Sequence, residues 1–409
     1  IDAKGCIVAP GLVDLAARLR EPGQEHAGML ESEMAAAVAG GVTSLVCSPD
    51  TDPVLDEPGL VEMLRYRAEK LHQARVLPLG ALTLGLKGDV LTEMGQLTAA
   101  GCVGFSQAEV PIPSTQVLQR ALQYASTFDY TVWLRPQELH LGKGVAASGP
   151  LATRMGLSGV SVAAETIALH TIFELVRSTR ARVHLCRISS AQGVELVRQA
   201  KAEGLPITAD VSINSLHLTD ADMGYFDSRA RLTPVLRQQR DRDALRVGLA
   251  DGTLDVLVSD HTPVDADAKA LPFAEAEPGA TGMELLWSLA LKWGQEAGLP
   301  VNQVLSRITA DPSRLAVVEG WTTHENMWTR RAALIIALPW AKMNNPKEAD
   351  LAVRERVLAW AEAYVPDLHL RMQLYRRLGE LSDLQEIDGF GAEMIDRFGP
   401  MPTEVQHLL

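Results

Sequence analysis

The sequence has little cysteine, no long apolar run and no excess of positive charge. Its four cysteines lie far apart and form no CxxC pair, a pattern that predicts neither a disulfide framework nor a structural zinc site and is typical of a reducing compartment. The chain has no run of about 18 apolar residues, which a membrane-spanning helix would need. Its first residues also lack the basic and apolar regions of a secretion signal. We therefore expect a cytoplasmic protein that is neither inserted into a membrane nor secreted.

The formal net charge of −13 argues against phosphate-backbone binding as the main activity, so nucleic acid is not the expected partner. Hydrophobic residues make up 47% of the chain and charged residues 22%, which is ordinary globular composition with ample material for a core. At 409 residues the chain is too long for one ordinary domain, but one large α/β barrel with a small appendage accounts for it. Because the sequence opens without Met, inside a predicted strand and turn, we expect it to be cut from a longer chain.

Short β-branched runs alternate with Ala/Leu-rich helical stretches from residue 1 to about residue 316. The strand runs are residues 42–47, 73–82, 102–105, 130–134, 182–186, 207–211 and 254–259. Repeated strand-helix units imply a parallel sheet, and about eight strand candidates favour a closed (β/α)₈ barrel of the TIM type over an open sheet. The predicted fold class is therefore α/β, with the chemistry expected just after each strand.

After residue 316 the alternation of strands and helices stops. Residues 317–363 predict a helical hairpin whose second helix is charged and amphipathic, and residues 364–409 predict further helices. We therefore expect an all-helical C-terminal appendage that begins near residue 317.

Five motifs follow one another through the barrel region. They are LREPG at residues 19–23, SPDTDPV at 48–54, ADVS at 209–212, DGTLD at 251–255 and SDHTP at 259–263. In order and spacing these motifs make residues 1–316 resemble a type I dihydroorotase of the amidohydrolase superfamily. The resemblance implies a barrel enzyme that opens or closes the cyclic amide of dihydroorotate, using a water activated by one or two zinc ions.

The first half of the family's metal site is replaced in this chain. Where the family's first strand carries two metal-binding histidines, the sequence has Ala16 and Arg18. Gln107 and Ala108 replace the family's carboxylates after a later strand, and Glu109 stands one residue out of place, where we expect its side chain to point elsewhere. An alanine has no donor atom and a guanidinium stays protonated, so neither can bind a cation.

The second half of the site departs from the family pattern in the same way. Arg135 and Arg187 stand where the family has histidines, and Asn214 lies in a segment, SINS, whose family counterpart also carries histidine. Only Asp260 and His261 survive, in the DHTP element. A catalytic zinc site needs about three protein ligands and a water, so we predict no metal, no cofactor and no catalytic residue.

The retained carboxylate, Asp260, needs a partner of opposite charge. In the family it is the general base that moves a proton to and from the metal-bound water. Here we expect it to pair with Arg18 or Arg187, since an unpaired buried carboxylate would be costly. His184, flanked by apolar residues, is expected to be a hydrogen-bonded core histidine.

Two further residues bear on ligand binding. Arg20 matches the family position that binds the substrate carboxylate, but an arginine near a barrel rim is more often the partner of a salt bridge. Asp50 replaces a family asparagine and would repel a carboxylate ligand beside Arg20. Both residues argue against binding of the family's substrate.

The ends of the chain suggest fragments. Residues 318–364 resemble one helical repeat of the DNA alkylation repair family, and residues 364–409 resemble the C-terminal domain of the transcription-repair coupling factor. One isolated hairpin should not carry glycosylase activity, because repeat proteins need several stacked units to bury a core. The small β-sandwich that the barrel family builds is incomplete, with only residues 1–8 on the N-terminal side.

The resemblance and the lost ligands together lead to one hypothesis and two alternatives. The hypothesis is an inactive dihydroorotase homologue that scaffolds aspartate carbamoyltransferase in pyrimidine biosynthesis, within an oligomer. One alternative is a weak dihydroorotase or related cyclic-amide hydrolase that uses Asp260 and an unusual metal arrangement. The other is a repair-associated interaction protein that acts through its helical tail.

Overall fold

The computed structural model describes residues 10–309 of the chain. The chain divides into two units, Ile1–Ala310 and Asp311–Leu409, and the described residues belong to the first. The sandwich remnant at residues 1–8, the expected boundary near residue 317 and the helical segments beyond it lie outside the described residues. These expectations stay predictions.

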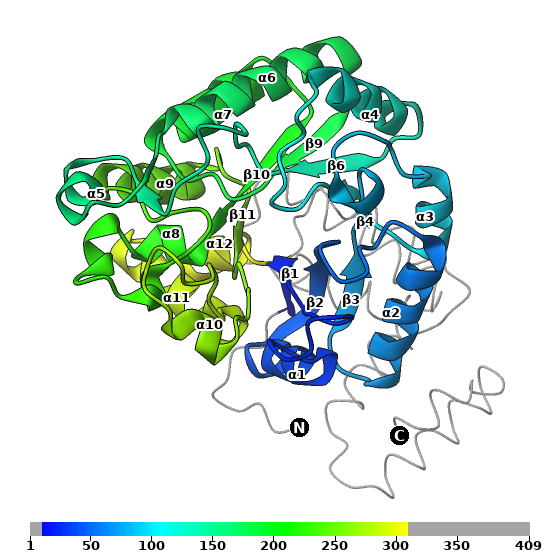
Figure 1. The fold of residues 1–409 in the computed structure, drawn as a ribbon, viewed down its shortest axis with the longest axis horizontal. Coiled ribbons are helices and arrows are strands. Elements are labelled where there is room, and N and C mark those ends of the chain that lie inside the picture. Colours follow the sequence, from blue (N-terminus) through cyan, green and yellow to red (C-terminus); the bar gives the residue numbers. More distant parts are fainter. Residues whose placement is uncertain (1–9, 310–409) are drawn as a thin grey trace, which may run out of the picture. The chain divides into compact units, whose positions relative to one another are not determined.

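A closed parallel barrel with eight strand positions forms the centre of the described unit (Figure 1). The strands are β1 (Leu12–Ala17), β2 (Val42–Cys47), β3 (Arg75–Pro78), β4 (Gly80–Ala81), β5 (Phe105–Ser106), β6 (Thr131–Leu134), β9 (Arg182–Leu185), β10 (Ile207–Ser212) and β11 (Val256–Val258). Only Leu79 separates β3 from β4, and its N–H donates to the carbonyl of Cys47 on β2 (3.0 Å). The two segments therefore fill one strand position.

The barrel closes where β1 meets the end of β11. The N–H of Arg18 donates to the carbonyl of His261 (2.9 Å), and the N–H of His261 donates to the carbonyl of Ala16 (3.1 Å). Ala17 and His261 form a parallel bridge. These bonds join the first and last strands and close the barrel. Because all its strands are parallel, their C-terminal ends share one rim.

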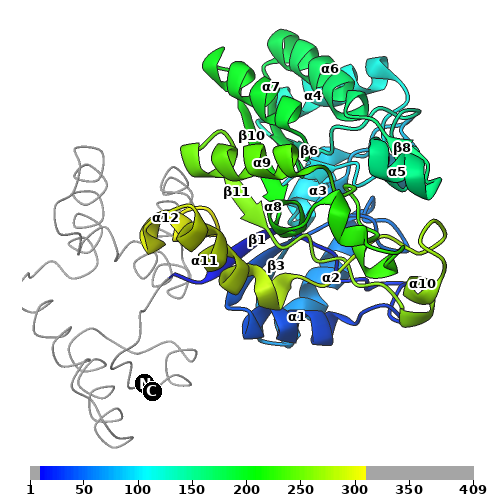
Figure 2. The same cartoon turned by 90° about the vertical axis from the view of Figure 1, so that its left-hand side faces the viewer.

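Helices surround the strands (Figure 1). They are α1 (Leu30–Ala39), α2 (Pro58–Lys70), α3 (Met94–Ala100), α4 (Thr115–Thr127), α5 (Pro150–Met155), α6 (Ala163–Thr179), α7 (Ala191–Ala202), α8 (Ile213–His217), α9 (Gln239–Asp251), α10 (Ala266–Ala270), α11 (Leu286–Glu296) and α12 (Val301–Leu305). A separate pair of short parallel strands, β7 (Ala146–Ala147) and β8 (Gly159–Val160), lies in the connection after β6. Figure 2 shows α5 and α10 at one end of the barrel and α12 at the other.

The helix α4 shows how the sequence specifies these elements. The hydroxyl of Ser114 accepts a hydrogen bond from the N–H of Val117 and caps the helix. The apolar side chains at Leu118, Ala121, Leu122 and Ala125 recur at helical spacing and are all buried. One face of the helix therefore packs on the barrel.

Apolar side chains fill the inside of the barrel as well as the layer between strands and helices. The inner cluster comprises Leu15, Val46, Leu79, Trp133 and Val258. Large residues that point inward from several strands are typical of a TIM-type barrel, whose interior is packed. The interior is thus a packed core, which the buried imidazole of His184 on β9 also enters beside Trp133.

The predicted barrel is confirmed, and the seven strand runs all contain strands. The observed strands are shorter than the runs in places: the run at 102–105 overlaps β5 only at Phe105, and the run at 73–82 holds both β3 and β4. Within the described part of the chain, no helix is long and apolar enough to cross a membrane.

Asp14 reinforces the closure of the barrel between β1 and the end of β11. Its carboxylate is fully buried on β1 and accepts hydrogen bonds from the N–H of Ser259 (3.0 Å), from the Ser259 hydroxyl and from the N–H of Ala16 (3.3 Å). Burial outweighs these bonds and raises the pKa of Asp14 to about 6. The carboxyl therefore links β1 to the end of β11, although its charged form is disfavoured by burial.

The substitution Asp14→Asn tests this buried charge. A carboxyl whose pKa rises on folding contributes stability that is full below its unfolded pKa of 3.8 and is lost as the pH rises through about 6. Between pH 5 and pH 8 the free energy of unfolding of Asp14→Asn should therefore rise by about 1 kcal/mol relative to wild type. Urea denaturation measures it, with the exposed Asp89→Asn as control, and parallel pH profiles for Asp14→Asn and wild type would contradict it.

Candidate functional site

Six charged side chains meet at the rim where the barrel strands end. They are Arg18 after β1, Asp50 after β2, Glu109 after β5, Arg135 after β6, Arg187 after β9 and Asp260 after β11. We call them the strand-end ion cluster. In barrels of this type the strand ends carry the functional residues, so the cluster occupies the place of an active site.

Glu109 is the centre of the cluster. One carboxylate oxygen accepts from Arg18 (2.8 Å) and from Arg187, and the other accepts from Arg135 (2.6 Å). Burial raises the pKa of Glu109, but the guanidiniums of Arg187, Arg135 and Arg18 outweigh it and hold the pKa well below its ordinary value. Glu109 is therefore an anion shared by three arginines.

Two outer carboxylates complete the charge balance. Arg18 donates through Nε to Asp50 (2.8 Å), and Arg187 donates to Asp260 (3.0 Å). Burial raises the pKa of Asp50, but the charge of Arg18 and the hydrogen bonds from Ser48 and Arg18 together outweigh burial, so the pKa is lowered. At Asp260 burial outweighs the attraction of Arg187 and Arg18, and its pKa is raised. The cluster holds three positive and three negative groups.

The expected ion pair of Asp260 is confirmed with Arg187. The expected direction of Glu109 is wrong. Ala108 has a left-handed backbone (φ 51°), and this turn aims Glu109 at the arginines. The side chain of Gln107 turns away instead, where its amide meets the hydroxyl of Thr83 (3.0 Å) and donates to the carbonyl of Leu86 (2.8 Å). Gln107 therefore lies outside the cluster, and Glu109 takes the central place.

A signal for Glu109 was present in the sequence. Arg18, Arg135 and Arg187 follow predicted strands, but only Asp260 is expected to pair with any of them, while Glu109 is expected to point elsewhere. Buried guanidiniums need counter-ions, so a further carboxylate was to be sought near the same rim. Glu109 is the acidic residue that follows β5.

The remaining predicted site residues do not join the cluster. Arg20 donates to the carbonyl of Pro263 (2.8 Å) and to Gln24 (2.8 Å), and it lies 3.7 Å from Glu277. Its donors are thus satisfied within the protein, in line with the salt-bridge role expected for it.

His261 points away from the cluster towards α1. Its Nε2 meets a carboxylate oxygen of Glu33 (2.5 Å), and its Nδ1 accepts from the N–H of Gly282 (3.2 Å). Ala16 contributes its carbonyl to barrel closure. Asn214 lies in α8, where its N–H donates to the Ser212 hydroxyl (3.2 Å), and within residues 10–309 its side chain makes no bond to the arginines.

Sequence comparison identifies the barrel. The family described as "Dihydro-orotase-like" matches residues 5–193. The "Dihydroorotase-like protein" of Pseudomonas aeruginosa is 44% identical over 315 residues, which cover 77% of this chain and 74% of that protein. The chain belongs to the dihydroorotase-like family. A "Dihydroorotase" of Syntrophotalea carbinolica is 37% identical, with 79% of this chain and 76% of that protein covered.

Solved structures agree on the fold of this dihydroorotase-like chain. L-hydantoinase (dihydropyrimidinase) from Arthrobacter aurescens has a TM-score of 0.68 at 21% identity and covers 78% of this chain and 74% of its own. Dihydroorotase in complex with 5-fluoroorotic acid from Saccharomyces cerevisiae has a TM-score of 0.61 at 14% identity, with 74% and 82% covered. At such low identity the likeness concerns the barrel fold alone.

Both resemblances of the tail are confirmed as sequence matches. Residues 290–374 match the family "DNA alkylation repair enzyme", a longer range than the expected 318–364. Residues 359–409 match the "TRCF domain", close to the expected 364–409.

The strand-end ion cluster does not fit a zinc ion. Arginine offers no lone pair to a metal, and both oxygens of Glu109 already accept from guanidiniums. A divalent cation about 4 Å from each arginine would be repelled by several kcal/mol per pair at an effective dielectric constant near 20. Zinc-assisted hydrolysis therefore has no support from these side chains.

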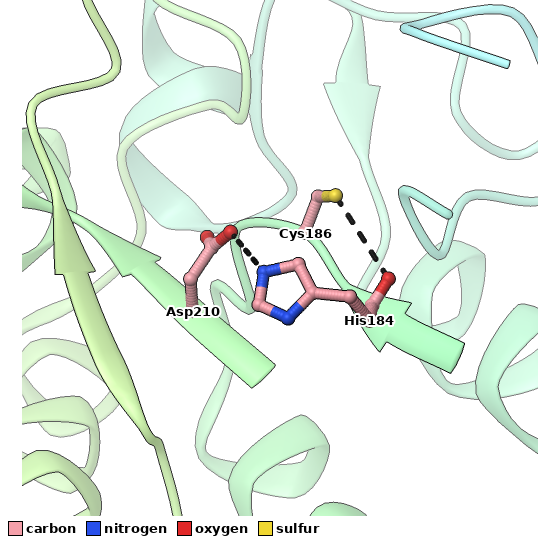
Figure 3. Close-up of side chains that lie close together, drawn as sticks. All are labelled: His184, Cys186 and Asp210. Atoms are coloured by element: carbon pink, nitrogen blue, oxygen red, sulfur yellow. Dashed lines mark hydrogen bonds and ion pairs between the residues drawn. The ribbon is translucent and has the colours of Figure 1, made fainter. Parts of the chain in front are cut away.

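A second group in the dihydroorotase-like barrel has ligand atoms close enough for a metal. The possible donors of His184, Cys186 and Asp210 lie within 4.8 Å of one another. Figure 3 shows the imidazole pointing to Asp210 and the sulfur pointing to the carbonyl oxygen of His184. The two ring nitrogens of His184 meet Thr208 (2.7 Å) and Asp210 (2.9 Å), so it is the hydrogen-bonded core histidine that was expected.

The other two members of this group are also engaged. Asp210 accepts from the N–H of Arg187 (2.6 Å) as well as from His184. Burial raises the pKa of Cys186 well above its ordinary value, which keeps the thiol protonated, whereas zinc binds the thiolate. His184 and Asp210 therefore form hydrogen bonds that link β9 to β10, and this arrangement leaves no suitable set of ligands for a metal.

The substitution Glu109→Gln tests the central anion of the cluster. Removing its charge leaves buried guanidiniums without their shared partner and should lower the free energy of unfolding by about 3 kcal/mol at pH 7.5. Because the pKa of Glu109 is depressed on folding, this contribution is present above the unfolded pKa near 4.5 and is lost at lower pH. The difference from wild type should narrow below about pH 4.5.

Urea denaturation of the full chain measures both effects. The control is Glu69→Gln, which breaks an exposed i,i+4 pair with Arg65 (3.5 Å) on α2 and should change stability by less than about 0.5 kcal/mol. Equal losses for the two variants would show that the three arginines do not depend on Glu109.

Proposed function

We propose that this chain is a non-catalytic member of the dihydroorotase-like family and serves as a structural subunit for aspartate carbamoyltransferase in pyrimidine biosynthesis. The observation that carries the proposal is the strand-end ion cluster. Its arginines stand where the family pattern has metal-binding histidines, and each of its carboxylates is engaged by a guanidinium. A barrel that keeps its fold without its ligands can still present surfaces to a partner.

The inactive state follows from the chemistry that the family's reaction needs. Hydrolysis of a cyclic amide in this family uses water activated by zinc, and the cluster offers no suitable set of ligands. Asp260, which would act as general base, is bound to Arg187 at 3.0 Å. The oxygen that accepts from Arg187 is thus already engaged within the protein, and the cluster has no ligand set to place a metal-bound water that could give it a proton.

Two alternatives each have one observation in their favour. A weak dihydroorotase or related cyclic-amide hydrolase is favoured by a relative named "Dihydroorotase" at 37% identity. A repair-associated interaction protein is favoured by the matches of the tail to the "TRCF domain" and "DNA alkylation repair enzyme" families.

A cytoplasmic location is part of the main proposal, supported by the free thiols Cys47, Cys102 and Cys186.

Metal content and activity provide the first test. We expect the purified full chain to contain far less than one zinc per molecule by elemental analysis and to show no conversion of dihydroorotate. An active dihydroorotase purified by the same route is the control. One tightly held zinc per chain, together with turnover that Asp260→Asn abolishes, would favour the hydrolase instead.

Complex formation provides the second test. Co-expressed with a carbamoyltransferase of a class that uses such a subunit, the full chain should form a stable assembly whose mass light scattering reports. Residues 1–316 should form the same assembly if the barrel supplies the docking surface. Absence of a complex at micromolar concentration with either chain would rule out the scaffold role.

A further inference from the structure

Beside the strand-end ion cluster lies a polar cavity of about 40 Å³. Three arginines line it: Arg135 after β6, Arg187 after β9, and Arg237 just before α9. Its wall also includes Ser189 and Gln137. Arginines from three separate segments therefore converge on one small space.

Arg237 is buried without an ion pair. Its side chain is 7% exposed; Nε donates to the hydroxyl of Ser189 (2.8 Å), and Nη1 lies 3.4 Å from the carbonyl of Val160. Among the residues that the structure describes, no carboxylate lies within 4.0 Å of its guanidinium. Burying a charged group without direct compensation is unfavourable, so the protein has reason to supply an anion here.

Arg187 has an unused donor, and Arg135 shares its one carboxylate partner with two other arginines. Nε of Arg187, a residue only 6% exposed, has no hydrogen-bond partner in the described part of the chain. Burial lowers the pKa of Arg135, because the attraction of Glu109, which it shares with two other arginines, does not outweigh the loss of water. The cavity is thus lined by three guanidiniums, one of which has an unused donor.

One carboxylate, Glu165, also faces this cavity and partly offsets the positive charge. Its two oxygens accept four hydrogen bonds from the N–H and hydroxyl groups of Ser189 and Ser190 (2.5–3.1 Å). The Ser189 hydroxyl connects it to Arg237, so compensation is indirect. The lone pairs of Glu165 are therefore turned to the serines, and the guanidiniums remain available to a ligand.

We propose that this cavity binds a small oxyanion, a carboxylate or phosphate group, between Arg135, Arg187 and Arg237. A water needs about 10–15 Å³ of such space, so a cavity of about 40 Å³ has room for about three oxygen-sized groups. That size suits the head of one carboxylate or phosphate group, and the planar guanidinium matches either in geometry. The inference rests on the arginines of the site and does not require the carbamoyltransferase partner.

Isothermal titration calorimetry of the full chain with sodium phosphate, and separately with sodium acetate, tests the proposal at constant ionic strength. At least one of the two ions should bind, and the ion that binds indicates the source of the ligand group. Arg237→Gln should weaken that binding by roughly tenfold or more, as expected for loss of a charge-assisted hydrogen bond. The control Arg240→Gln removes the same charge from a side chain that is 72% exposed, and it should leave binding unchanged.

A second variant keeps the test decisive if Arg237→Gln does not fold. Gln137→Glu places a negative charge on the half-buried wall of the cavity with little change of shape, and it should weaken anion binding while circular dichroism stays that of wild type. No binding of either ion to the wild-type chain would overturn the proposal. So would equal affinities in wild type and in every folded variant of the cavity.

Discussion

The strand-end face of this protein depends on one carboxylate, Glu109, held among three guanidiniums. The arginines come from three different strand ends, and Glu109 is the carboxylate that all three share; Arg135 has no other ion pair among the described residues. In the family pattern the centre is a cation and the ligands around it are imidazoles and carboxylates. Here the polarity is inverted, with an anion in the middle and cations around it, and the same strands are still tied together.

The backbone at the rim is consistent with exchange of side chains on a retained frame. Arg20, Ala108, Arg187 and Asp260 are left-handed non-glycine residues, with φ between 51° and 61°, and all four follow barrel strands. Such conformations cost about 1 kcal/mol or more each and persist where the surrounding structure imposes them. They turn side chains sharply at the strand ends, which is how Arg187 and Asp260 come within 3.0 Å of each other.

Local pattern predicted the barrel, and charge balance predicted part of the site. In the strand run at residues 42–47, Leu45, Val46 and Cys47 are successive apolar residues that are all buried, because both faces of a parallel barrel strand are covered. The pair of Asp260 with Arg187 followed from the need to compensate a buried charge. The direction of Glu109 was wrongly predicted because it depends on the φ of Ala108, which the sequence does not reveal; only the number of buried arginines indicated a further carboxylate. Arg237 was missed because its significance lies in the lack of a carboxylate near it in space.

The strand-end ion cluster also limits which substitutions could restore a zinc site in this chain. Replacing Arg18 alone by histidine would restore one imidazole and leave Asp50 without its guanidinium partner, while Arg135 and Arg187 would still hold both oxygens of Glu109. A divalent cation placed there would face two remaining positive charges. Restoring one histidine at a time would therefore leave a carboxylate of the cluster without its arginine before a complete set of metal ligands exists. The ion cluster therefore has to change as a unit, which makes the arrangement self-maintaining once it has formed and is consistent with the structural role proposed for the barrel.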